Sequence, residues 1–452
     1  MLIHEIVGSG ILLCLFLGVI ALAEWVTRKQ WLAPEPARKS IHVTGGLGCV
    51  LFPFLVESWV SVLVLALLLA LVLHLGEHSG KLRALASVDR KSYGSLLFPL
   101  AILFLFVMGQ ERLWLYVSAL LVLVLADTAA ALAGTRFGVN RFATSKGQMK
   151  SLEGTAMFGV VGFLCVYLSL LFLSDIPHVT CILTALLMAI LLAGLEAVSI
   201  GGTDNLFVPI GTCFLLLKIS TKPQTEILFQ CISFLVIAGL VFVMNHRSQT
   251  FRTRPLIIFI LACYATWTLG SAEWMLPMLV GFTLYLWFCR SCEPLPSPLS
   301  ARQLLRPLYP LLIILFFANA KGAFDFWFVP FIVACASTTS MCIESRFRLY
   351  GHGNPLQGAR LWTTLLLPSL LSLLACLPAQ GTAVFSVLPF VVPLCALAGL
   401  AYHWSKLPTA NDSWGNYAIT VYSGLAALVY AGLQQAGAVQ PLSPLTWMEV
   451  FR

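Results

Sequence analysis

Charged residues are scarce in this chain. Only 10% of its 452 residues are Asp, Glu, Lys or Arg, whereas 59% are hydrophobic and the mean hydropathy is +0.91. Soluble globular domains carry about 25% charged residues. The composition therefore excludes a soluble domain and predicts an all-α, polytopic integral membrane protein.

Other common signals are also missing. Residues 1–10 contain Glu5 and no Lys or Arg, which predicts a retained first span instead of a cleaved signal peptide. The 13 cysteines show no regular spacing, which predicts reduced core residues and no disulfide framework. The string nearest to a P-loop begins at Gly76, is one residue short and has Leu82 where a hydroxyl is needed, and no dinucleotide fingerprint follows a strand. These two soluble modes of nucleotide binding are therefore excluded.

What the chain does contain is a series of apolar runs, about 16 of which are long enough to span or nearly span a bilayer. The run 207–218 is short and has Pro209 near its start, so a re-entrant or half-buried segment is an alternative there. With the N-terminus outside, most of the 27 Lys and Arg residues fall in inner loops, as the positive-inside rule requires.

The charged residues divide the chain into two parts. Up to about residue 245 the inner loops combine acids, histidines and glycines with their basic residues, whereas the later spans carry few charges. We therefore predict a site-bearing membrane domain over 1–245 and an additional helical membrane domain over 255–452, whose role the sequence leaves open.

The stretch Ala126–Thr155, ADTAAALAGTRFGVNRFATSKGQMKSLEGT, contains the strongest indication of a site. Asp127 lies inside an apolar run, and an ionisable group in a spanning helix is by default a functional-site hypothesis. Ala130, Ala131 and Gly134 follow on its helical face, so this face lacks bulk and allows close approach.

Further polar residues lie on the same predicted inner side. Basic residues interspersed with glycines are suited to binding polyphosphate, and acids at the ends of apolar runs are suited to binding a divalent cation together with phosphates. The candidate residues are Arg38, Lys39, His42, Asp127, Arg136, Arg141, Lys146, Lys150, Ser151, Glu153, Glu196, Asp204 and Asn205. Together they indicate a metal–nucleotide site at a membrane surface.

Four blocks carry a family resemblance. RKSIHVTGG, RKSYGSLLFPLAI, ADTAAALAGTRFG with KSLEGT, and EAVSIGGTDNLFVPI resemble the CTP-dependent membrane lipid kinases, namely dolichol kinase, phytol kinase and the fungal-type diacylglycerol kinase. The resemblance covers about residues 35–215. The third block is also similar to the phosphatidate cytidylyltransferases, but the late block of those enzymes is absent here.

The resemblance implies transfer of the γ-phosphate of CTP to the hydroxyl of a polyprenol, dolichol or phytol at the cytosolic face, with Mg²⁺. In that reading Asp127 and Asp204 bind Mg²⁺, and Glu153 or Glu196 is a further ligand or the base that orients the hydroxyl. The phosphates would contact Lys146, Lys150 and Ser151, completed by Arg38, Lys39 and His42, with Arg136, Arg141 and Asn205 nearby.

Several alternatives stay open from the sequence. The acceptor is diacylglycerol in one alternative, and in another the protein is a cytidylyltransferase that makes a CDP-activated lipid. A non-enzymatic lipid transporter or scaffold is a third. The expected partners are CTP, a lipid alcohol and the bilayer, with no nucleic acid.

Overall fold

A computed structural model describes residues 2–31, 34–78, 94–145, 148–199, 202–248, 250–288, 290, 301–350, 358–405 and 413–444. Lys146 and the side chain of Arg38 lie outside the described residues. The chain forms two compact units, 1–232 and 233–452, whose boundary falls within helix α12 (Gln224–Ser248).

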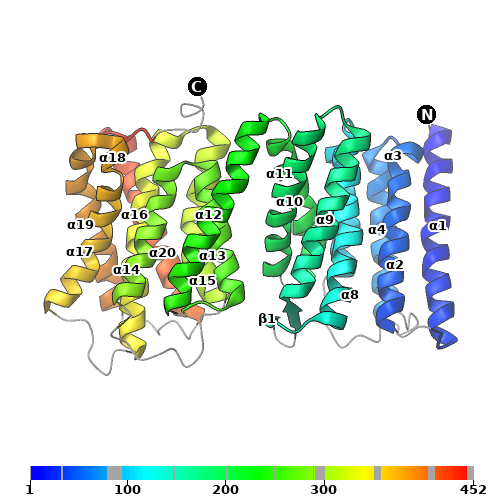
Figure 1. Cartoon of the computed structure of the whole chain (residues 1–452), viewed down its shortest axis with the longest axis horizontal. Helices are drawn as coiled ribbons and strands as arrows, with labels where there is room; N and C mark the ends of the chain where they lie inside the picture. The colour runs from blue at the N-terminus through cyan, green and yellow to red at the C-terminus, as the bar shows by residue number, and fades with distance from the viewer. Residues whose placement is uncertain are drawn as a thin grey trace. The chain divides into compact units, whose positions relative to one another are not determined.

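The described part of the first unit is a bundle of helices with one β-hairpin (Figure 1). Its helices before the hairpin are α1 (Leu2–Arg28), α2 (Pro34–Gly48), η1 (Cys49–Leu51), α3 (Phe52–Leu55), α4 (Trp59–His78), α6 (Gly94–Gly109), α7 (Leu113–Leu121), the π-helix η2 (Val122–Ala126) and α8 (Asp127–Phe137). The hairpin strands are β1 (Arg141–Ser145) and β2 (Gln148–Ser151), followed by α9 (Leu152–Leu173), α10 (His178–Val198) and α11 (Asp204–Ile219).

The described part of the second unit is helical. After α12 its elements are α13 (Thr253–Leu269), α14 (Ala272–Phe288), α15 (Ala301–Lys321), α16 (Phe324–Tyr350), α17 (Gly358–Ala375), α18 (Leu377–Gln380), η4 (Gly381–Ala383), α19 (Val384–Trp404) and α20 (Ser413–Gln435). Helix α16 is the most enclosed candidate span, because 83% of its apolar window is buried.

Nine helices in the described ranges are long and apolar enough to cross a membrane, and six further apolar helices are shorter. The outer surface of α9 illustrates why these helices need a membrane. Val160, Leu164, Leu168 and Phe172 recur every fourth residue and are 43–76% exposed, whereas Phe158 on another face is buried. An apolar stripe left open to the surroundings is suited to lipid. The all-α membrane fold is confirmed, but nine full-length candidates are fewer than the 16 runs predicted.

Two local predictions are refined by the structure. The run 207–218 lies in α11, whose 16 residues, with Pro209 inside, fall short of the roughly 20 needed for a full span. The glycine-punctuated loop expected after Asp127 contains an antiparallel hairpin in which Phe142 pairs with Lys150, with an irregular register between Ala143 and Ser145.

Candidate active site

Asp127 follows directly on the π-helix η2, within a continuous helix over Leu113–Phe137. A π-helical turn contains more residues than an α-helical turn and is frequent at functional sites. The Asp127 Oδ2 atom is 2.8 Å from Lys39 Nζ, and the two side chains are 19% and 17% exposed. Asp127 therefore has a counter-ion that lies 88 positions away in the sequence and that ligands can still reach.

Helix α2 brings Lys39 and His42 to this acid. His42 Nε2 donates to the Leu123 carbonyl in the π-helix at 3.2 Å and lies 3.8 Å from Asp127 Oδ2. The close approach requires Gly46, because a Cβ atom there would lie 2.2 Å from Val124 Cγ2. The glycine-rich end of α2 thus serves helix packing beside the site.

The face of α8 that lacks bulk is covered by the start of α9. A Cβ atom on Gly154 would lie 2.8 Å from the Ala130 carbonyl oxygen and 3.3 Å from Gly134 Cα. Ser151 caps α9, since its Oγ accepts from the Gly154 amide at 3.0 Å, and the Ser151 side chain is buried. The small residues after Asp127 therefore let two helices meet closely.

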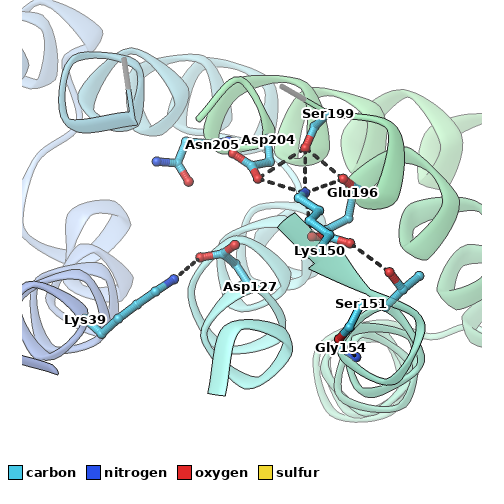
Figure 2. A network of polar contacts seen from close by, with 10 residues as sticks. Lys39, Asp127, Lys150, Ser151, Gly154, Glu196, Ser199, Asp204 and Asn205 are labelled. Carbon is cyan, nitrogen blue, oxygen red and sulfur yellow. Dashed lines mark hydrogen bonds and ion pairs between the residues drawn. The ribbon is translucent and has the colours of Figure 1, made fainter. Parts of the chain in front are cut away.

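Lys150 is the centre of a second group of contacts, shown in Figure 2. Its Nζ atom lies 2.6 Å from Glu196 Oε1, 2.5 Å from the Glu196 carbonyl oxygen, 2.9 Å from Ser199 Oγ and 3.3 Å from Asp204 Oδ2. These partners come from the end of α10 and the start of α11. The hairpin strand β2 thus connects the ends of two helices through one ammonium group.

The charges of this site are nearly balanced by the protein itself. Burial alone would lower the pKa of Lys150, but the charges of Glu196 and Asp204 outweigh that effect and raise the pKa above its ordinary value. Three carboxylates, those of Asp127, Glu196 and Asp204, thus pair with the two lysines Lys39 and Lys150. Carboxylate oxygens of this kind are also ligands for a divalent cation.

Glu153 lies outside this group of contacts. Its Oε1 atom accepts from the Asn140 amide at 3.0 Å and from Asn140 Nδ2 at 2.9 Å, so it holds the turn before the hairpin. Arg136 and Arg141 are exposed, and Arg141 Nε donates to the Gly138 carbonyl at 3.0 Å. Of the sequence-predicted residues, the structure brings together Lys39, His42, Asp127, Lys150, Glu196 and Asp204, with Asn205 next to Asp204.

Sequence reasoning missed two hydroxyl residues. Ser199 Oγ lies 2.7 Å from the Glu196 carbonyl oxygen and 3.2 Å from Asp204 Oδ2, and Thr155 Oγ1 lies 3.4 Å from Glu196 Oε2. The signal for Ser199 was its position at the end of an apolar run, two residues before the glycine pair Gly201 and Gly202. Thr155 is one turn beyond Ser151 on α9 and had no comparable signal.

The carboxylates are better suited to a metal ion that is also bound by nucleotide phosphates than to a metal ion that is bound by protein side chains alone. Within the described residues, no group of three or more His, Cys, Asp and Glu side chains is placed to hold a metal ion. Mg²⁺ at nucleotide sites is usually held by one or two carboxylates, phosphate oxygens and water. Asp127 and Asp204 offer such oxygens, and in Figure 2 both lie on the same side of Lys150 as Asn205.

These features define a multi-pass membrane protein whose first unit holds a cluster of carboxylates and lysines at one end of its helices. The chain is 32% identical to phytol kinase of Synechocystis sp. over 205 residues, which are 44% of this chain and 86% of that protein. The chain therefore belongs to the lipid kinase family that includes phytol kinase, which confirms the resemblance seen in the sequence. More than half of the chain lies outside that aligned stretch. No protein-family model and no solved structure matches the chain.

Proposed function

We propose that this protein transfers the γ-phosphate of CTP to the hydroxyl of an isoprenoid alcohol, either phytol or a polyprenol. The observation that carries the proposal is the joint placement of Asp127, Lys39, Lys150, Glu196 and Asp204 in a unit of a chain related to phytol kinase. Phosphoryl transfer requires mainly positioning of the reactants and neutralisation of charge on the transferred group. Clustered acids and lysines supply both requirements.

The proposed roles follow from the contacts that each group makes. Asp127 and Asp204 would hold Mg²⁺, which when bound neutralises phosphate charge. Lys39 is a long side chain from a different helix than its partner Asp127, so it is suited to move its ammonium group onto a phosphate oxygen. Arg38 and Lys146 remain predicted phosphate ligands that lie outside the described side chains.

Glu196 is the better candidate for the group that orients the acceptor hydroxyl. It lies among the clustered residues, and its Oε2 atom is within 3.4 Å of Thr155 Oγ1. Glu153 instead bonds the backbone and side chain of Asn140. The lipid tail of the acceptor would remain in the bilayer beside the exposed apolar surfaces of helices such as α9.

The test of this function uses purified protein in detergent with Mg²⁺, γ-labelled CTP or ATP, and a panel of phytol, polyprenol and diacylglycerol. Label from CTP is expected in an isoprenoid alcohol. Asp127→Asn should reduce that transfer at least about 100-fold. Asp175→Asn is the matched control, because this exposed acid follows the far end of α9, about 33 Å along the helix from its start. Transfer of the label to diacylglycerol alone would contradict the proposed acceptor.

We further propose that the site faces the cytosol, with the N-terminus outside. The support is the charge distribution, since the basic residues beside the site belong to the predicted inner loops. Arg141 and Thr221 are exposed residues near opposite ends of the first unit, so Arg141→Cys and Thr221→Cys form a pair for labelling with an impermeant maleimide. In intact cells only Thr221→Cys should react, and labelling of Arg141→Cys alone would reverse the orientation.

A further inference from the structure

Within the described part of the chain, the polar atoms that contact the ammonium group of Lys150 are oxygens. Four oxygens surround it: the carbonyl and Oε1 of Glu196, Ser199 Oγ and Asp204 Oδ2, at 2.5–3.3 Å. An ammonium group has three N–H donors. These protein oxygens therefore already satisfy its hydrogen-bonding capacity before any phosphate is present.

Three separate elements depend on this ammonium group for their mutual placement. Glu196 lies in the last turn of α10, Asp204 begins α11, and Lys150 lies on β2. Without a cation between them, two carboxylates held near one another repel in a partly buried setting. The Ser199 hydroxyl contacts the Glu196 carbonyl oxygen and Asp204 Oδ2. Because this hydroxyl is neutral, it cannot replace the positive charge of Lys150.

We propose that Lys150 is a positioning residue, a built-in counter-cation that fixes Glu196 and Asp204 in place, and not a phosphate ligand. The proposal concerns the same site as the proposed kinase function. It predicts an effect on the protein without nucleotide, however, so it can be tested even if the kinase proposal fails. A lysine that binds phosphate instead would matter mainly once nucleotide is bound.

The first experiment compares the thermal unfolding of wild type, Lys150→Met and Lys222→Met in detergent without nucleotide. Lys222 is the matched control, because its side chain is 19% exposed against 22% for Lys150 and it also pairs with an acid, Glu226. Its pair joins residues four apart, and such isolated pairs contribute little. Lys150→Met should therefore lower the melting temperature clearly more than Lys222→Met.

The second experiment replaces the lost cation in Lys150→Ala. Propylammonium chloride should raise the melting temperature of this variant and leave that of wild type unchanged, because its ammonium group can donate to the four oxygens. Tetramethylammonium chloride has the same charge but no N–H donor, so it should have no effect. If folded Lys150→Ala protein can be purified only in propylammonium chloride, that result also supports the proposal. Equal loss of folded protein in propylammonium chloride and in tetramethylammonium chloride would overturn it.

Kinetics provide the remaining distinction. A positioning role predicts that Lys150→Met lowers kcat with less than about threefold change in KM for CTP, whereas loss of a phosphate contact present in both ground and transition states raises KM. Lys150→Arg should retain more activity than Lys150→Met because it keeps the positive charge. Wild-type stability of Lys150→Met together with a large rise in KM would overturn the proposal. If the wild-type protein shows no kinase activity, the comparisons of melting temperature alone test the role of Lys150.

Discussion

Gly46 offers the clearest test of how the fold positions the site, because it lets α2 approach the π-helix that precedes Asp127. A Cβ atom at Gly46 would lie 2.2 Å from Val124 Cγ2 and 2.9 Å from its Cγ1. Val124 is fully buried, and a β-branched side chain in a helix has one strongly preferred rotamer, so it has little freedom to move away. Overpacking of this kind costs about 1–3 kcal/mol.

Gly46→Ala also has a stabilising effect, because Ala has a higher helix propensity than Gly, and the experiment must separate this effect from the clash. Ala favours a helix interior over Gly by up to about 1 kcal/mol. Gly18→Ala in α1 is the matched control, since nothing lies within 4 Å of its added Cβ atom, and we expect it to be neutral or stabilising. Gly46→Ala should be destabilising and should reduce kinase activity about tenfold or more, because α2 carries Lys39 and His42 to Asp127.

Thermal unfolding in detergent measures both variants, and a second substitution isolates the clash. In a Val124→Ala background the steric conflict is removed, so Gly46→Ala should there become neutral or stabilising. Equal stability of Gly46→Ala and Gly18→Ala in the wild-type background would refute the packing argument. Destabilisation that persists with Val124→Ala would assign the effect to some other contact.

Three further predictions follow from the site. Asp127→Asn should remove activity while the protein still inserts and unfolds cooperatively, as measured by turnover and by membrane extraction, and turnover near that of wild type would contradict the assignment. Glu196→Gln should reduce kcat at least about 100-fold. Glu153→Gln should reduce kcat less than about tenfold, because Glu153 is hydrogen-bonded to Asn140. The reverse order of the two effects would exchange the roles of these acids. Because the pKa of Lys150 is raised in the folded protein, its contribution to stability is complete below the pKa of an unfolded lysine, about 10.4, and is lost only at higher pH. The difference in melting temperature between wild type and Lys150→Met should therefore be constant from about pH 7 to about pH 9, and a difference that shrinks over this range would show the opposite shift.

Long apolar helices were predictable from the sequence because their composition alone requires a membrane. Helices α9 (Leu152–Leu173) and α10 (His178–Val198) are two such apolar segments. The number of full spans was less predictable, because helices such as α11 are apolar yet short.

The residue types of the site were also predictable, but their pairing was not. Asp127, Glu196 and Asp204 were singled out because acids in apolar runs need counter-ions. Which lysine meets which acid depends on tertiary packing, so the sequence could not place Lys39 on Asp127 or Lys150 between the other two. Nor does any local pattern mark the π-helix before Asp127, which is packed against α2 at Gly46.

The central claim is that the clustered residues of the first unit transfer the terminal phosphate of CTP to a lipid alcohol. Its most direct test gives the purified protein phytol with CTP labelled at either the α- or the γ-phosphate and counts label in the organic phase. We predict lipid label from γ-labelled CTP and none from α-labelled CTP. Lipid label from the α-phosphate would instead identify a cytidylyltransferase, and no label from either, in the presence of Mg²⁺ and with the wider lipid panel, would contradict the kinase account.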